Sequence, residues 1–464
     1  MAIAIHFLPI DFSSVAAGFL SAIGICVEMI MNKFRFFASL LAAVPLVAVA
    51  QSPGNQSDVA KRVEHVLSTT PVIDGHNDLP WEIRGNFGNV GNVDLEKSTA
   101  DLTIKGKDGS TKSVHLMTDI PRMHKGHMGA QFWSVWIPAT TTGPKAVQMA
   151  LEQIDLVHNM CAKYPQDFAM AYTAADVKHI EKQGKIACLI GVEGGEMINN
   201  SMAVLRDFYR LGARYMTLTH SLTTDWADSA TDKPEHGGLT PFGRDVVKEM
   251  NRLGMMVDLS HVSPDTMRDA LETTRAPVIF SHSSARALVD YPRDVPDDIL
   301  RMVKKNGGVV MVNFYPVFVS EADNIWYAKH AGASKRYHTQ YVGQPERIKK
   351  AMAQWEADHP RPQATIAEVA DHIEHIAKVA GYQSVGIGSD FDGIGMTPKG
   401  LDGVDKYPAL FRELARRGWT DEQLAGLAGR NVLRVLAKVE QVAKKLRKTE
   451  HPSHATLKVD DPSS

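Results

Sequence analysis

PVIDGHNDLP, residues 71–80, is the stretch from which the fold of this chain can be worked out. Val72 and Ile73 are β-branched and predict a short buried strand. His76 and Asp78 follow two residues apart, and alternate residues of an extended chain point to the same side. An imidazole and a carboxylate aimed at one place can share a metal ion. Chance occurrence is the alternative for a single His-x-Asp pair.

Seven further apolar runs follow and are separated by segments with the pattern of amphipathic helices, such as 147–160 and 241–253. Strands that alternate with helices favour parallel pairing. Eight such units predict an α/β fold, a (β/α)8 TIM-type barrel with helical and loop insertions at 84–130 and 318–365. The eight expected strands lie around residues 72–73 and at 132–137, 186–192, 215–219, 255–258, 277–281, 309–313 and 384–388.

Residues capable of metal binding or catalysis stand where several of these runs end. A barrel brings its strand ends together at one mouth, so residues distant in sequence can form one site. A single histidine after a strand is more often structural, but three after consecutive runs favour a shared site, since neutral imidazole is a common zinc ligand. The residues are Glu193, His220, His261, His282 and Asp390. For Asp390, a helix N-cap is the alternative.

Arg293 lies in the loop after the sixth run. A guanidinium can hold a carboxylate through two parallel hydrogen bonds, so Arg293 is a candidate for binding a substrate carboxylate. A surface charge is the alternative. His372 and His375 have i, i+3 spacing, unlike the His-Glu-x-x-His of zinc proteases. We interpret both as residues of a helix surface, and Glu196 as a solvated loop residue.

Composition and charge exclude some classes of function. Of the 464 residues, 44% are hydrophobic and 22% are charged, and the net charge is -2 without a basic block, which argues against nucleic acid as a partner. No run after residue 51 is apolar for long enough to span a membrane.

Residues 1–50 have the pattern of a signal or targeting region. A basic segment beginning at Met31, an apolar segment and small residues up to Ala50 predict a start at Met31 and cleavage after Ala50. We therefore expect export, with a periplasmic location. An uncleaved N-terminal membrane anchor is the alternative, because residues 2–30 are also apolar. The catalytic domain is expected over 51–443, with a polar C-terminal tail at 444–464.

Two cysteines, Cys161 and Cys188, remain after the expected cleavage. Cys188 lies within an apolar run, which favours a small buried side chain. A disulfide with Cys161 is the alternative that export would permit. Neither cysteine has the setting of a nucleophile.

Taken in order, the motifs resemble those of the membrane (renal) dipeptidase family, and the resemblance extends from about residue 60 to about residue 440. One such motif would be weak evidence, but seven in the same order are specific. The motifs are DGHNDLP (74–80), GVEGG (191–195), TLTHS (217–221), DLSHVS (258–263), FSHSS (280–284), RDVPDD (293–298) and DFDG (390–393).

The resemblance implies two zinc ions per subunit and hydrolysis of dipeptides that carry a free C-terminal carboxylate. It assigns His76 and Asp78 to one ion, His261 and His282 to the other, and Glu193 to both. His220 would contact the scissile carbonyl, Arg293 the terminal carboxylate, and Asp390 the reacting water and the leaving amine. A homodimer is expected by analogy. The cysteines and C-terminal apolar tail of mammalian members are missing. An N-acyl amino acid deacylase and a non-catalytic binding protein remain alternatives.

Overall fold

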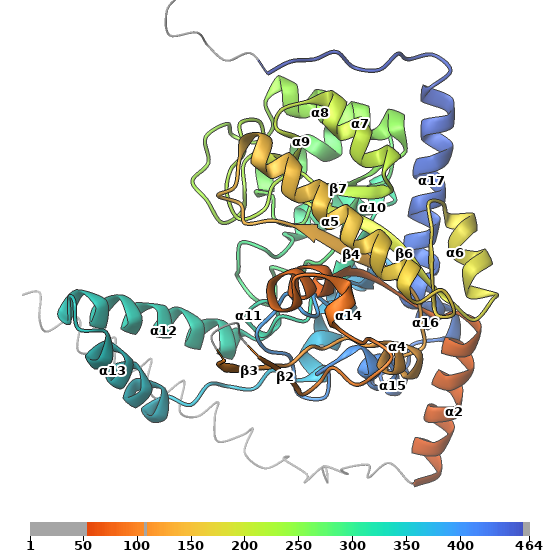
Figure 1. Ribbon diagram of the computed structural model, residues 1–464. Helices are drawn as coiled ribbons and strands as arrows, with labels where there is room; N and C mark the ends of the chain where they lie inside the picture. Colours follow the sequence, from red (N-terminus) through yellow and green to blue (C-terminus); the bar gives the residue numbers. More distant parts are fainter. Residues whose placement is uncertain (1–52, 106–108, 458–464) are drawn as a thin grey trace, which may run out of the picture. The chain divides into compact units, whose positions relative to one another are not determined.

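The apolar runs of the sequence form the buried strands of a (β/α)8 barrel (Figure 1). The structure is a computed structural model that describes residues 53–105 and 109–457. The expected signal region, with its start at Met31 and cleavage after Ala50, lies outside these ranges. Each expected strand is found: β1 (Val72–Asn77), β4 (Met128–Trp136), β6 (Ile186–Glu193), β7 (Ala213–Thr217), β8 (Met256–Asp258), β9 (Ile279–Phe280), β10 (Val309–Val312) and β11 (Val385–Ile387).

All pairings within the barrel are parallel, and the strand order is β4-β1-β11-β10-β9-β8-β7-β6. The barrel closes because β4 also pairs with β6, where Trp136 lies beside Glu193. A short strand, β5 (Phe168–Met170), pairs with the first half of β6. Since all eight strands are parallel, their carboxyl ends meet at one mouth.

Helices cover the outside of the strands, as expected for parallel β-strands joined by crossovers (Figure 1). Several begin with a side-chain cap, such as Ser263, whose hydroxyl accepts from the Thr266 amide. The helices are α2 (Pro53–Thr69), α5 (Gly143–Lys163), α6 (Ala174–Glu181), α7 (Met202–Arg210), α8 (Pro241–Leu253), α9 (Pro264–Thr273), α10 (Asp297–Asn306), α14 (Ile366–Ala380), α15 (Tyr407–Arg416), α16 (Asp421–Ala425) and α17 (Asn431–Leu446).

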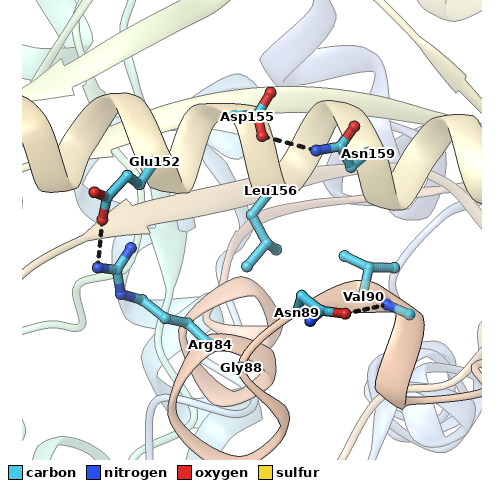
Figure 2. A pocket seen from close by; sticks show the side chains of 9 residues that line it. Arg84, Gly88, Asn89, Val90, Glu152, Asp155, Leu156 and Asn159 are labelled. Atoms are coloured by element: carbon cyan, nitrogen blue, oxygen red, sulfur yellow. Dashed lines mark hydrogen bonds and ion pairs between the residues drawn. The ribbon is translucent and has the colours of Figure 1, made fainter.

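The first long insertion follows β1. It contains α3 (Leu79–Glu82), the π-helix η1 (Ile83–Phe87), the antiparallel pair β2 (Leu102–Lys105) and β3 (Thr111–Val114), and α4 (Ile120–Lys125). A cavity of about 550 Å³ separates η1 from α5, and the ion pair of Arg84 with Glu152, at 2.6 Å, lies on its wall (Figure 2). None of the sequence-predicted site residues lines this cavity.

The second long insertion follows β10. After the short α11 (Pro316–Val319), α12 (Glu321–Gln340) and α13 (Pro345–Asp358) form a helical hairpin (Figure 1). Ring contacts join the two helices, for example Trp326 with Trp355 at 5.7 Å. Asp323 is the one fully buried side chain of these two helices, where it pairs with Arg361.

Cys161 and Cys188 are joined by a disulfide, which corrects the expectation that Cys188 is only a small buried residue. Cys161 lies on α5 and Cys188 on β6, and both side chains are buried. Helix α5 packs against β6 and brings the two Cα atoms to 6.8 Å. This contact between a helix and a strand arises from tertiary packing, which the spacing of two cysteines does not reveal.

Among the described residues, no helix is both long and apolar enough to cross a membrane. Helix α17 ends at Leu446, so the C-terminal segment expected from residue 444 begins inside its last turn. Beyond the helix, Ser453 donates its amide to Glu249 of α8 at 3.1 Å.

Candidate metal centre and substrate cavity

The strand ends bring the sequence-predicted residues together at the mouth of the barrel. His76 belongs to β1 and Asp78 follows that strand; Glu193 ends β6. His220, His261, His282 and Asp390 follow β7, β8, β9 and β11. A cavity of about 430 Å³ is lined by Asp78, Glu193, His220, His261, His282, Arg293 and Asp390. His76 is fully buried and adjoins three of them.

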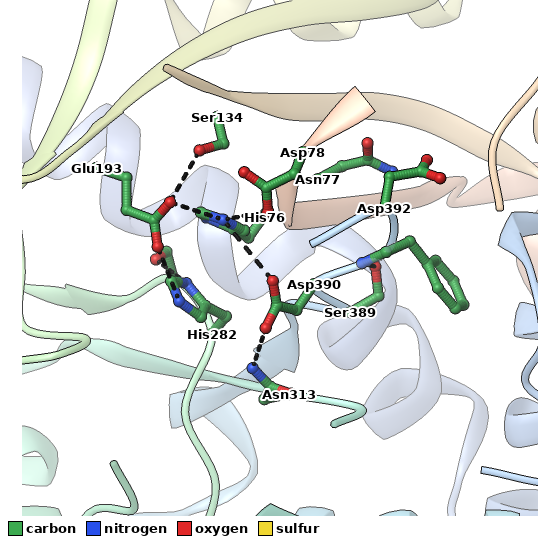
Figure 3. A network of polar contacts seen from close by, with 12 residues as sticks. His76, Asn77, Asp78, Ser134, Glu193, His282, Asn313, Ser389, Asp390 and Asp392 are labelled. Carbon is green, nitrogen blue, oxygen red and sulfur yellow. Dashed lines mark hydrogen bonds and ion pairs between the residues drawn. The ribbon is translucent and has the colours of Figure 1, made fainter. Parts of the chain in front are cut away.

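Glu193 lies between two sets of ligand atoms (Figure 3). Its Oε2 is 3.4 Å from His76 Nε2 and accepts from Ser134 Oγ at 3.0 Å. Its Oε1 is 2.9 Å from His261 Nε2 and 3.3 Å from His282 Nε2. One oxygen of the Glu193 carboxylate therefore faces the His76 imidazole, and the other faces the imidazoles of His261 and His282.

Asp78 and Asp390 complete the His76 side of the site. Asp78 Oδ2 is 3.1 Å from His76 Nε2, and Asp390 Oδ1 is 4.0 Å from the same nitrogen. Burial, with the charges of Asp78 and Glu193, raises the pKa of Asp390 to about 7. Asn313 donates to Asp390 Oδ2 at 2.9 Å and opposes that rise. Asp390 has a left-handed backbone, with φ 65°, a strained conformation that is frequent at functional sites.

Hydrogen bonds leave the lone pairs of two imidazoles facing the site. Tyr215 donates its single hydroxyl proton to Gly75 O at 3.1 Å, so His76 Nδ1, also 3.1 Å from that hydroxyl, must be the donor to it. Ser281 likewise donates to a carboxylate oxygen of Asp258 at 2.7 Å and accepts from His282 Nδ1 at 2.8 Å. Both Nε2 atoms are then free to bind a metal.

The donor set fits divalent metal ions. Three groups of ligand atoms each lie within 4.8 Å of one another: those of His76, Glu193 and His282; of Glu193, His220 and His261; and of His76, Asp78 and Asp390. Burial lowers the pKa of His261 and His282 well below the usual value, so both rings are neutral, as ligands must be. Burial alone would also lower the pKa of His76, but the charges of Glu193 and Asp78 raise it well above the usual value. The carboxylates of Glu193 and Asp78 thus stabilise a positive charge next to His76. A bound metal ion would supply that charge in place of the proton on the ring.

Arg293 reaches the cavity from the loop after β9. The side chain is 3% exposed, and its guanidinium donates to His282 O at 3.3 Å and lies over the Phe318 ring at 5.4 Å. In the described part of the chain, no carboxylate oxygen is within 4.0 Å of it. A buried guanidinium without a charged partner is suited to an anionic group of a ligand. His220 Nε2 lies 3.6 Å from Glu193 Oε1 and faces the same cavity.

Some residues of the site were missed by sequence reasoning. Tyr215, Ser134 and Ser281 orient His76, Glu193 and His282 from inside or next to apolar runs. Their signal would have been a polar residue at an inward position of a buried strand. Gly393 was also missed as a site residue: a Cβ at this position would lie 2.2 Å from Asp78 Oδ2.

Two interpretations of residues outside the site are corrected. His372 of α14 is buried and not on the helix surface, and its Nδ1 accepts from the Ala285 amide at 2.9 Å. His375 is partly exposed and pairs with Asp297 at 2.7 Å. Glu196 is half-buried, and burial raises its pKa to about 8, which does not fit a solvated loop residue.

Comparison with known proteins gives a family and a fold. The family model Membrane dipeptidase (Peptidase family M19) matches residues 60–450. The probable dipeptidase PvdM from Pseudomonas aeruginosa is 24% identical, with a TM-score of 0.68 over 83% of this chain and 100% of that one. The metallopeptidase called dipeptidase AC is 26% identical, with a TM-score of 0.62 over 80% and 99%. A metallopeptidase from Rhodobacter sphaeroides, liganded with a phosphinate mimic of the dipeptide L-Ala-D-Ala, is 24% identical, with a TM-score of 0.63 over 80% and 99%.

Proposed function

Because the chain belongs to the membrane dipeptidase family and is a dipeptidase-type hydrolase, we propose that it is a zinc-dependent enzyme that cleaves dipeptides with a free C-terminal carboxylate. Two zinc ions per subunit would be held at the mouth of the barrel. His76 and Asp78 would bind one ion, His261 and His282 the other, and Glu193 would bind both.

The position of Glu193 is the observation that carries this proposal. One carboxylate oxygen faces His76 and the other faces His261 and His282, at 2.9 to 3.4 Å. A carboxylate whose two oxygens face separate groups of candidate metal ligands can bind two neighbouring cations, and this supports a site for two ions.

When bound, such ions supply a water of lowered pKa and polarise the peptide carbonyl. The protein's own residues would do the rest. Arg293 would bind the terminal carboxylate, and so restrict substrates to short peptides. His220 would stabilise the charge that develops on the carbonyl oxygen. Asp390, whose burial raises its pKa toward neutrality, would accept the proton of the attacking water and donate it to the leaving amine.

The test is a hydrolysis profile of purified enzyme loaded with zinc. L,L- and L,D-dipeptides are compared with N-acyl amino acids, which keep the carboxylate but lack the free amine. We expect dipeptide turnover that a chelator abolishes and zinc restores. Preferential turnover of N-acyl amino acids would instead identify a deacylase, and zinc-loaded protein without turnover of either class would identify a binding protein.

We further propose that the mature enzyme is a periplasmic homodimer. The predicted signal region and the disulfide in the barrel support export, since disulfides persist in oxidising compartments. Light scattering of purified enzyme and fractionation of producing cells test the two parts. A monomer, or a protein that remains in the membrane fraction through residues 1–50, would contradict them.

A further inference from the structure

Asp258 is a buried carboxylate that the proposed chemistry does not use. It ends β8, is fully buried and does not line the substrate cavity. Its Oδ1 accepts from the amides of Ser260 and Ser281, at 3.1 and 2.8 Å. Its Oδ2 accepts from the hydroxyls of Thr217 and Ser281, at 2.5 and 2.7 Å. Ser281 follows β9, the neighbour of β8 in the barrel, so Asp258 holds the end of the next strand by both the amide and the hydroxyl of one residue.

The same set of four hydrogen bonds occurs again at Asp74 of β1. Asp74 Oδ1 accepts from the amides of His76 and Ser389, at 3.3 and 2.8 Å. Its Oδ2 accepts from the hydroxyls of Ser389 and Tyr407, at 2.5 and 2.6 Å. Ser389 follows β11, which is the neighbour of β1. We call each set an Asp–Ser clamp. In both clamps the residue directly after the serine belongs to the site, which indicates that the clamps position these residues.

The two clamps differ in the further contact of the serine hydroxyl. Ser389 Oγ accepts from the Phe391 amide at 3.2 Å, whereas Ser281 Oγ lies 2.8 Å from His282 Nδ1. A serine has one hydroxyl proton, and the carboxylate of Asp258 is the stronger acceptor of it. Ser281 therefore donates to Asp258 and accepts from the imidazole. The proton of the neutral His282 ring is held on Nδ1, and the lone pair of Nε2 faces the site.

We propose that Asp258 is a positioning residue, which acts through Ser281 to keep His282 in the tautomer whose Nε2 can bind a metal ion. The inference rests on the proposed function, which assigns His282 to a zinc ion. Asp258 itself would touch neither that ion nor the substrate. Replacing a residue that orients a metal-binding imidazole typically weakens metal binding by about 10- to 100-fold.

Replacement of Asp258 by Asn should reverse the direction of this hydrogen-bond chain. The two backbone amides at Oδ1 can only donate, so the new side chain must place its carbonyl oxygen there and turn its NH2 group toward Ser281. The serine hydroxyl would then accept from that NH2 group and donate its own proton to His282 Nδ1. The proton of the ring would move to Nε2, where it blocks metal binding.

The first measurement is the zinc affinity of metal-stripped enzyme, by competition with a chelator. Asp258→Asn and Ser281→Ala should each weaken one of the two zinc-binding steps at least about tenfold. Because both act through one hydrogen-bond chain, the double variant should bind zinc within about twofold of Ser281→Ala. Thr217→Val also removes a hydroxyl from Asp258 but none from an imidazole, and should keep both affinities within about twofold. Ser389→Ala, the matched change in the other clamp, should do the same.

The second measurement reports the tautomer without any metal. Nitrogen NMR spectra of metal-free enzyme with isotope-labelled histidine distinguish a proton on Nδ1 from one on Nε2, and the signal missing from His282→Gln identifies the ring. We expect the proton on Nδ1 in wild type and on Nε2 in Asp258→Asn. Urea unfolding of the metal-free forms should show similar losses of stability in Ser281→Ala and Thr217→Val, since each removes one hydroxyl from Asp258.

Contrary results separate this inference from the proposed function. Unchanged zinc affinity in Asp258→Asn, or an equal loss in Thr217→Val or Ser389→Ala, would overturn the positioning role while dipeptide hydrolysis by wild-type enzyme stands. Fully additive losses in the double variant, or a wild-type His282 proton on Nε2, would also overturn it. If wild-type enzyme binds no zinc and hydrolyses no dipeptide, the proposed function fails, and the spectra alone decide whether Asp258 sets the tautomer.

Discussion

Glu193 links the two halves of the site, because each of its oxygens faces a different set of ligands. Replacement by Gln leaves one oxygen and an amide that cannot bind a cation. We expect Glu193→Gln to lose one or both zinc ions and at least about a thousandfold in kcat/KM, or about 4 kcal/mol. Metal analysis and dipeptide kinetics check this. Glu152→Gln, an exposed control, should retain both, and a fully active Glu193→Gln enzyme would refute the site.

Arg293 is predicted to control KM. The Arg293 guanidinium is buried without a carboxylate partner among the described residues. A substrate carboxylate would therefore have no competing carboxylate within ion-pair distance of it. We expect Arg293→Ala to raise the KM for dipeptides at least tenfold, because a charge-assisted contact is lost. Arg293→Lys should recover part of the effect, since an ammonium keeps the charge but loses the paired geometry. An unchanged KM in the alanine variant would remove this role.

At the level of residues, the sequence reveals candidate site residues better than the residues that support them. His76, Glu193 and Asp390 could be predicted because each stands where an apolar run ends. Tyr215 could not be distinguished from an ordinary core aromatic, since its contact with His76 depends on how β7 faces β1 across the barrel. The mutual distances of the ligands depend on closure of the barrel, which no local pattern encodes.

Helix α14 is held to the loop after β9 by His372. The ring accepts from the Ala285 amide, and burial lowers its pKa to about 4. Because the pKa of His372 is lower in the folded state, the unfolded state takes up a proton at a higher pH than the folded state does. The contribution of His372 to the free energy of unfolding is therefore fully present above pH 6.5 and is lost as the pH falls from 6.5 toward 4. From pH 7 to pH 5 the contribution to the free energy of unfolding falls by about 2 kcal/mol.

Urea unfolding at the two pH values checks the His372 prediction. In His372→Asn the fall between pH 7 and pH 5 should be smaller by about this amount, because Asn does not titrate. An identical pH dependence in wild type and His372→Asn would contradict the assignment.

At the level of elements, the sequence pattern predicted the eight barrel strands because each lies in a short, buried and mainly apolar run. It did not distinguish His372 from a surface residue, since its helix has polar neighbours at both Asp371 and Glu374. The segment 318–365 was expected as a loop or helical insertion, and it forms the α12–α13 hairpin. Its helices pack mainly on each other through aromatic rings, a pairing that composition alone does not show.

For the whole molecule, metal binding should be linked to folding, because the ligands come from strands throughout the barrel. A ligand that binds only the folded state stabilises it. We expect removal of zinc to lower the melting temperature by about 5–10 °C, and zinc to restore it. Calorimetry checks this, with His261→Ala as a control that should respond less. Equal melting temperatures with and without zinc would show that the ligands do not converge on bound ions.

The covalent link between α5 and β6 makes the cellular history of each molecule measurable. Copies that stay in a reducing cytoplasm should keep two free thiols at Cys161 and Cys188. Exported copies, apart from the mass lost with the expected signal region, should lack two hydrogens at these cysteines and should be alkylated there only after reduction. Intact mass analysis of separate cell fractions would therefore report which copies crossed the membrane, without a tag, an antibody or an activity assay.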